Sequence, residues 1–176
     1  MDRAGLLPLL SAERIAARVG ELGATIDADF PDAGRPLWLV GALKGAAFFL
    51  ADLARAIRRD VRLDFVRASS YGASTESSGT VRLLLDLSAD VAGCDVILAE
   101  DIVDSGRTAN ALVRLLQSRN AASVTIAALL DKPSRRVEPV EIRYRGFEIE
   151  DRFVVGYGLD AAESYRNLPG VWTLGA

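Results

Sequence analysis

Three apolar runs constrain the fold of this chain more than any other feature of its sequence. They occupy residues 37–40, 96–99 and 124–130, and segments with apolar side chains at helical spacing separate them. A strand that is apolar throughout is typical of a parallel sheet with both faces covered by helices. Strands that alternate with helices in this way form α/β folds. We therefore predict one α/β domain over residues 1–176, in which a mostly parallel, twisted sheet is flanked by helices.

The loops that follow these strands are where a ligand is expected. In open α/β sheets, ligands bind beyond the carboxyl ends of the strands, which here correspond to residues 41–45, residues 101–108 and the segment after Leu130. A separate stretch, residues 69–79, holds five serines, two glycines and no aliphatic side chain larger than alanine. This composition predicts a flexible loop over about residues 69–80.

The composition excludes several kinds of chemistry. The chain has no histidine and a single cysteine, Cys94, which excludes Ser-His-Asp triads, histidine-ligated metals, multi-cysteine zinc sites and intrachain disulfides. A net charge of −3 argues against a nucleic-acid partner. No apolar run approaches about 20 residues, so no membrane span is expected. The start of the chain does not read as a signal peptide, and the expected location is the cytoplasm.

The sharpest local signal is the sequence VILAEDIVDSGRT at residues 96–108. An apolar strand ends in the adjacent carboxylates Glu100 and Asp101, and a glycine-containing turn then opens a helix. Backbone amides and hydroxyls at the start of a helix bind phosphate, and neighbouring carboxylates suit sugar hydroxyls and Mg²⁺. The purely structural alternative is that Asp104 or Ser105 caps the helix. The spacing favours phosphate and ribose binding, with capping left open.

This segment resembles the phosphoribosyl-pyrophosphate motif of the type I phosphoribosyltransferases. The similarity extends over nearly the whole chain and is strongest to the bacterial hypoxanthine-guanine branch of that family. The matching stretches lie, in order, at residues 40–53, 66–81, 99–108, 129–136, 146–160 and 165–169. A single such motif is fairly specific, and several in the right order are very specific.

The resemblance implies a fold, an activity and its partners. The expected fold is a type I phosphoribosyltransferase domain, with a small hood over the base site built from the N-terminal and C-terminal segments. The expected reaction transfers ribose 5-phosphate from phosphoribosyl pyrophosphate to a 6-oxopurine, with Mg²⁺, and releases pyrophosphate. The family also implies a homodimer or homotetramer.

The resemblance further assigns the residues that hold the activated sugar. Glu100 and Asp101 would hold the ribose hydroxyls and the metal, and Asp104 would also act as general base toward ring nitrogen 7 of the purine. The pyrophosphate would contact the turn at Lys44, which in the family often follows a non-proline cis peptide. The full sets are, for the 5-phosphate, Asp104, Ser105, Gly106, Arg107 and Thr108, and for pyrophosphate, Lys44, Gly45 and Arg166.

The purine site is assigned in the same way. Lys132 would donate to the 6-oxo group, Phe153 would stack on the ring and Val154 would offer backbone groups to its edge. Asp160 would lie near the exocyclic 2-position and a second Mg²⁺. Ser70 and Tyr71 would begin the loop that closes over the reacting centre.

Plainer interpretations stay open for these residues. Lys44 and Lys132 are the only lysines beside 19 arginines, and either fits an ordinary solvated cation. Phe153 alone would be taken for a core strand residue, and Asp160 with Arg166 for a surface ion pair. A sensor of phosphoribosyl pyrophosphate without catalysis, or a xanthine-preferring transferase, are the alternative functions. Residues 161–162 and Glu150 depart from the family pattern near the base pocket, so base preference stays open.

Overall fold

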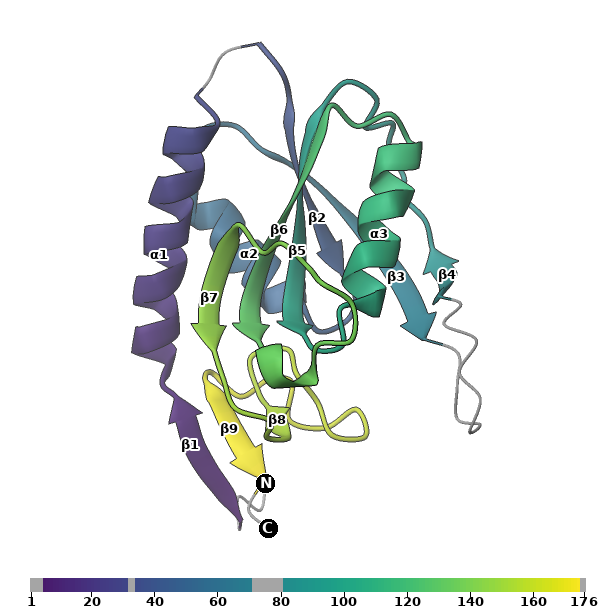
Figure 1. The fold of residues 1–176 in the computed structure, drawn as a ribbon. Coiled ribbons are helices and arrows are strands. Elements are labelled where there is room, and N and C mark those ends of the chain that lie inside the picture. The colour runs from purple at the N-terminus through teal and green to yellow at the C-terminus, as the bar shows by residue number, and fades with distance from the viewer. Residues whose placement is uncertain (1–4, 32–33, 71–80, 175–176) are drawn as a thin grey trace.

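The computed structural model describes residues 5–31, 34–70 and 81–174. Figure 1 shows a central sheet of six strands in the order β4-β3-β2-β5-β6-β7. All neighbouring pairs are parallel except β3 and β4, which are antiparallel. The strands are β2 (Leu37–Ala42), β3 (Arg62–Ser70), β4 (Val81–Leu85), β5 (Asp95–Val103), β6 (Ser123–Asp131) and β7 (Tyr144–Glu148).

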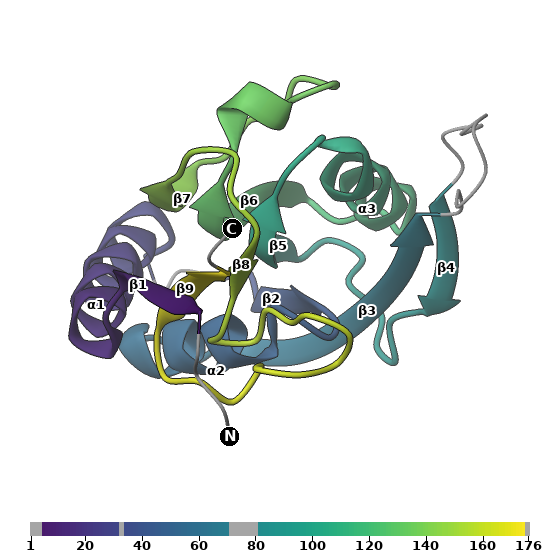
Figure 2. The same ribbon diagram turned by 90° about the horizontal axis from the view of Figure 1, so that it is seen from below.

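Helices cover both faces of this sheet. α1 (Ala12–Asp29) and α2 (Ala47–Ala56) pack on one face, and α3 (Arg107–Ser118) packs on the other (Figures 1 and 2). Phe49 and Leu53 of α2 belong to the first core, whereas Leu112 and Leu116 of α3 belong to the second. Among the described residues, no helix combines the length and the apolar character needed to cross a membrane.

The three apolar runs of the sequence lie side by side in β2, β5 and β6, as predicted. Because successive side chains of a strand point to opposite faces, Leu39 and Ile97 enter the first core while Val40 and Leu98 enter the second. All four side chains have no exposed surface. The prediction of a mostly parallel α/β sheet with helices on both faces is confirmed.

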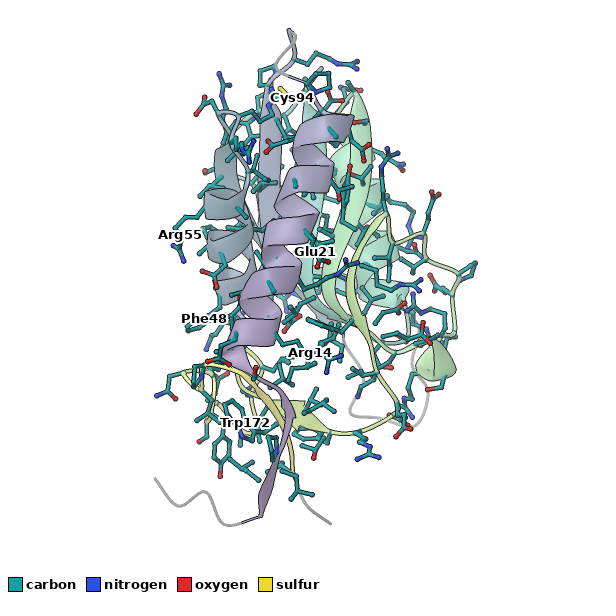
Figure 3. The ribbon with its side chains drawn as sticks, turned by 90° about the vertical axis from the view of Figure 1, so that its left-hand side faces the viewer. Arg14, Glu21, Phe48, Arg55, Cys94 and Trp172 are labelled. Carbon is teal, nitrogen blue, oxygen red and sulfur yellow. The ribbon has the colours of Figure 1, made fainter. Side chains whose placement is uncertain are left out.

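A second, three-stranded sheet, here called the hood sheet, lies at the carboxyl ends of the central strands. It pairs β1 (Leu6–Leu10) with β9 (Val171–Leu174) and β9 with β8 (Val154–Val155), all antiparallel. Figure 3 shows Trp172 of this sheet at the opposite end of the molecule from Cys94, and Phe48 and Arg55 on the outer side of α2. The free thiol of Cys94 is therefore remote from any site at the carboxyl ends.

One local prediction is wrong, and the structure decides one alternative that the sequence left open. The loop expected from Ser69 begins later, because Ser69 and Ser70 extend β3 by pairing with Arg82 and Val81 of β4. Gly106, in the left-handed region with φ 87°, is the N-cap of α3, and Ser105 Oγ accepts from the first helical amide, that of Arg107, at 3.4 Å. Capping therefore does not explain the carboxylate of Asp104. Tyr71 lies outside the described residues.

Candidate functional site

A pocket of about 320 Å³ opens at the carboxyl ends of β2 and β5. Three segments that are distant in sequence form its walls: the turn after β2, the end of β5 with the loop into α3, and one loop between β8 and β9. The lining residues predicted from sequence are Lys44, Gly45, Glu100, Asp101, Asp104, Ser105, Gly106, Thr108, Asp160 and Arg166. Arg107, Lys132, Phe153 and Val154 do not line it, and Arg107 Nε instead lies 4.0 Å from Glu138 Oε1.

Glu100 and Asp101 bring two carboxylates to the base of the pocket. Glu100 is 5% exposed, and within the described part of the chain no group hydrogen-bonds its Oε1. Burial, followed by the neighbouring Asp101 charge, raises the pKa of Glu100 well above its usual value. Burial also raises the pKa of Asp101 to about 6, although the Ile102 amide donates to its carboxylate at 2.9 Å. Both side chains are therefore poised to receive a cation or a hydroxyl donor.

This carboxylate pair fits the implied Mg²⁺. A buried carboxylate oxygen without a partner is costly to keep charged, and a hard divalent cation prefers oxygen ligands of this kind. The described residues contain no cluster of three or more possible metal-ligating side chains. The expected ligand set of Glu100, Asp101 and Asp160 is thus not preassembled, and a bound Mg²⁺ would need further oxygens from its substrate and water.

The loop from Asp104 to Thr108 shapes the wall above these acids. Gly106 turns the chain into α3, whose positive N-terminal end then faces the pocket. The Ser105 carbonyl accepts from the amides of Val137 and Glu138 at 2.9 and 3.0 Å, which fixes the loop against the segment after β6. These contacts place the loop as a cradle beside a helix start, an arrangement of the kind that binds an anion.

Asp104 faces an arginine that sequence reasoning did not identify. Its Oδ1 lies 3.4 Å from Arg135 Nε, and no described residue hydrogen-bonds that oxygen. Arg135 also lies 3.7 Å from Asp151, and Asp151 lies 3.8 Å from Lys132 Nζ. These ion pairs link the cradle to Lys132. The arginine pair that follows Lys132-Pro133 in the sequence is the signal that could have pointed to this contact.

Gly45 packs directly on Asp101, one of the two acids at the base of the pocket. A Cβ placed on Gly45 would lie 1.5 Å from Asp101 Oδ2, so no other residue fits without moving that carboxylate. Gly158 of the β8–β9 loop has φ +99°, and its own Cβ would lie 2.0 Å from the Gly45 carbonyl oxygen. The peptide bond between Leu43 and Lys44 is cis. The turn after β2, Asp101 and the β8–β9 loop therefore pack directly against one another.

The cations of the pocket are paired with acids. Lys44 is half exposed, and its Nζ lies 2.9 Å from Glu163 Oε2. Arg166 Nη2 lies 2.8 Å from Asp160 Oδ1, and Arg166 Nη1 donates to the Gly158 carbonyl at 2.7 Å. The Asp160–Arg166 pair is not an isolated surface pair, because both residues line the pocket. Glu163 is the second functional candidate that the sequence did not single out.

Lys132 is buried, which contradicts its interpretation as an ordinary loop cation. It is 7% exposed, and its Nζ donates to the Arg152 carbonyl at 2.5 Å. Its backbone amide donates to the Val103 carbonyl at 3.0 Å, which ties it to the end of β5. An ammonium group has three donors, so the Arg152 contact leaves others for a ligand.

Two arginines contact a buried acid that precedes Lys132 in the sequence. Asp131, the last residue of β6, is 1% exposed and accepts from the guanidinium of Arg136, and its Oδ2 lies 2.9 Å from Arg145 Nε. Arg136 also donates to the Val103 carbonyl at 3.3 Å. Asp131, which immediately precedes Lys132, therefore connects β6 both to β7 and to the segment that follows β6.

Phe153 is exposed and is not the core strand residue that its sequence context alone suggests. Its side chain is 59% exposed just before β8, whereas Val154 is 6% exposed within β8. An exposed aromatic ring that follows Arg152, the contact of Lys132, is available to stack on a flat ligand. Ser70 ends β3, and its proposed partner in the closing loop, Tyr71, is not among the described residues.

The raised pKa of Asp101 predicts a pH-dependent gain of stability for Asp101→Asn. The carboxyl group of Asp101 loses its proton near pH 3.8 in the unfolded chain and near pH 6 in the folded protein. The free energy of unfolding therefore falls as pH rises from 3.8 to 6, and the whole loss is present above pH 6. About two pKa units at about 1.4 kcal/mol each set an upper bound near 3 kcal/mol. Without substrate, Asp101→Asn should melt several degrees above the wild type at pH 8 and close to it at pH 4.

Asp60→Asn provides the control for this melting experiment, because it removes a charge from an exposed carboxylate. It should leave the melting temperature nearly unchanged at both pH values. A gain for Asp101→Asn that is equal at pH 4 and pH 8 would contradict burial of the charge as its cause.

The comparisons with known proteins all find similarity to phosphoribosyltransferases. The model of the phosphoribosyl transferase domain matches residues 8–162. A hypoxanthine-guanine phosphoribosyltransferase of Mycobacterium avium is 49% identical over 170 residues, covering 94% of this chain and 84% of the relative. The Bacillus subtilis protein of that name is 48% identical over 166 residues, covering 94% and 91%. A crystal structure of a Staphylococcus aureus hypoxanthine phosphoribosyltransferase superimposes with TM-score 0.91 at 45% identity, covering 97% and 92%.

Proposed function

Because this chain belongs to the phosphoribosyl transferase domain family, we propose that it transfers the 5-phosphoribosyl group of phosphoribosyl pyrophosphate to hypoxanthine or guanine. The products are IMP or GMP and pyrophosphate, a reaction of purine salvage. The observation that carries this proposal is the meeting, in one pocket, of a buried and a partly buried carboxylate, an anion cradle at a helix start and two cations. Each of these groups matches one part of the sugar substrate.

The sugar would lie along the pocket from the cradle to the turn after β2. Its 5-phosphate binds the amides and hydroxyls between Asp104 and Thr108, and its ribose hydroxyls donate to Glu100 and Asp101. Glu100 and Asp101 would also hold Mg²⁺, which when bound would neutralise charge on the pyrophosphate. Lys44 and Arg166 bind the pyrophosphate itself, which leaves as the bond to the anomeric carbon breaks.

The purine would approach from the side of Lys132 and Phe153. Ring nitrogen 9 forms the new bond to the anomeric carbon, and the proton on nitrogen 7 passes to the carboxylate of Asp104. Ion pairs through Arg135 and Asp151 link Asp104 to Lys132, so Asp104 lies on the side of the cradle where such a proton transfer needs an acceptor. In a chain without histidine, a carboxylate is the fitting base.

A steady-state assay with phosphoribosyl pyrophosphate, Mg²⁺ and each of four bases tests this function. We expect turnover with hypoxanthine and guanine, little with adenine, and none with excess EDTA. Turnover with xanthine above both would favour the xanthine-preferring alternative. Binding of phosphoribosyl pyrophosphate without turnover on any base would favour the sensor, and full turnover in EDTA would contradict the metal's role.

Lys132→Ala tests how the base is selected. The substitution removes the donor to the 6-oxo group and adds no acceptor, so hypoxanthine use should fall without a gain of adenine use. An unpaired buried polar group costs about 1–3 kcal/mol, which is about a ten- to hundredfold loss of kcat/KM for hypoxanthine. An unchanged efficiency, measured on protein with a wild-type melting temperature, would remove Lys132 from the base site.

We also expect a homodimer or homotetramer in the cytoplasm. Phe48, Leu63, Leu84 and Leu85 are each 44–48% exposed on α2, β3 and β4, and such side chains are suited to a subunit contact. Light scattering of the purified protein would give the subunit number.

A further inference from the structure

The carboxylate of Glu163 pairs with Lys44 and Arg166, the two cations that the proposed function assigns to pyrophosphate. Its Oε2 lies 2.9 Å from Lys44 Nζ and 3.4 Å from Arg166 Nη2. Lys44 and Arg166 line the pocket from two different segments, the turn after β2 and the β8–β9 loop. One acid side chain therefore joins both halves of the cationic site.

The backbone of the loop aims this carboxylate. The Glu163 amide donates to Asp160 Oδ2 at 2.7 Å, while Asp160 Oδ1 pairs with Arg166. Ala162, Glu163 and Tyr165 all have positive φ, a conformation that residues other than glycine rarely adopt. In Figure 2, the segment between β8 and β9 passes near the end of β2 and the start of α2, where Lys44 lies. The geometry of Glu163 is thus set by the loop and not by its side chain alone.

The charge and exposure of Glu163 make its contacts easy to replace. The hydrogen bond from Lys44, more than any other contact, lowers the pKa of Glu163, so the carboxylate is ionised at neutral pH. Its side chain is 63% exposed, and exposed ion pairs contribute little to stability. Pyrophosphate carries several negative charges and offers several oxygens, so it would bind the same two cations more strongly than one carboxylate does.

We propose that Glu163 is a displaceable internal occupant of the pyrophosphate site. It neutralises Lys44 and Arg166, yields them when pyrophosphate or its sugar ester binds, and competes for them as pyrophosphate leaves. The inference rests on the proposed function only in naming pyrophosphate as the competing anion. It makes Glu163 a determinant of anion affinity, and its removal should strengthen binding of the anion.

Calorimetric titration with pyrophosphate in the presence of Mg²⁺ tests the sign of this effect. Glu163→Gln keeps the size of the side chain and the Glu163 amide bond to Asp160, but it removes the negative charge. We expect the variant to bind pyrophosphate about three- to tenfold more tightly than the wild type, as loss of one or two exposed ion-pair competitors allows. Equal or weaker binding would overturn the proposal, and weaker binding would show that Glu163 orients the two cations.

Glu148→Gln is the matched control. Glu148 is 60% exposed and pairs with Arg145 at 3.3 Å, so the variant loses the same charge from a comparable ion pair outside the pocket. Its affinity for pyrophosphate should equal that of the wild type. A gain as large as that of Glu163→Gln would assign the effect to net charge and overturn the proposal.

A second measurement separates this inference from the proposed function. The chain has two lysines, so the side-chain resonances of Lys44 can be assigned with one lysine variant. They should shift in Glu163→Gln, and pyrophosphate should shift them in the wild type. Unchanged Lys44 resonances in Glu163→Gln would contradict the ion pair itself. Absence of base transfer in the steady-state assay would overturn the proposed function and leave both Glu163 comparisons interpretable.

Discussion

Asp104→Asn is expected to lower turnover by about 10²- to 10⁴-fold, the usual effect of removing a general base. Asparagine has nearly the shape of aspartate but cannot take up a proton at neutral pH. The fold should survive, because α3 begins at a Gly106 N-cap and does not use Asp104. The melting temperature should therefore stay within a few degrees of the wild type, with phosphoribosyl pyrophosphate still bound.

Two comparisons isolate the proton transfer in this experiment. Asp151→Asn removes the other carboxylate near Arg135, which lies 3.7 Å from it, and should cost less than tenfold because no proton passes to it. A purine analogue whose nitrogen 7 ionises more readily should lose less with Asp104→Asn than hypoxanthine does. Near-wild-type turnover of Asp104→Asn, or equal losses in the two variants, would place the base elsewhere.

Asp131→Ala is expected to give the largest loss of stability. It leaves the guanidinium of Arg136, whose side chain is 16% exposed, without its carboxylate, and breaking a buried ion pair costs about 3–5 kcal/mol. In a protein of this size each kcal/mol lowers the melting temperature by about 2–4 °C, so a fall of about 10 °C is expected. Differential scanning calorimetry measures it directly.

The control for Asp131→Ala is an exposed pair on a helix. Glu21 of α1 is 64% exposed and pairs with Arg18, so Glu21→Ala should cost less than about 1 kcal/mol. A melting temperature for Asp131→Ala within 2 °C of the wild type would show that solvent or other groups satisfy Arg136.

The sequence predicts best where a local pattern determines the structure. The apolar runs in β2, β5 and β6 were identifiable because a strand buried on both faces admits few polar residues. The acids and the cradle at residues 100–108 were identifiable because they occupy one continuous segment after such a strand. Six of the ten predicted residues that line the pocket belong to this one segment.

Contacts between distant loops were not predictable in this way. The pairing of Lys44 with Glu163 spans 119 residues, and the approach of Arg135 to Asp104 depends on the short 3-10 turn at Pro133–Arg135. Neither contact leaves a periodic pattern, because each depends on how irregular segments pack after the sheet has formed. The N-cap at Gly106 was missed for a related reason: the left-handed backbone of this residue starts α3, and a glycine has no side-chain acceptor that a sequence pattern could reveal.

The close packing of Gly45 sets a limit on variation at this site that a mutational scan would reveal. A methyl group at position 45 would displace the carboxylate of Asp101 from its place at the base of the pocket. A methyl group at position 158 would meet the backbone of Gly45, which cannot rotate away as a side chain would. Alanine at either position should therefore score among the inactive variants, although neither glycine has a side chain with which to touch a substrate. Intolerance at positions 45 and 158 would measure a lack of space and would not identify chemical groups.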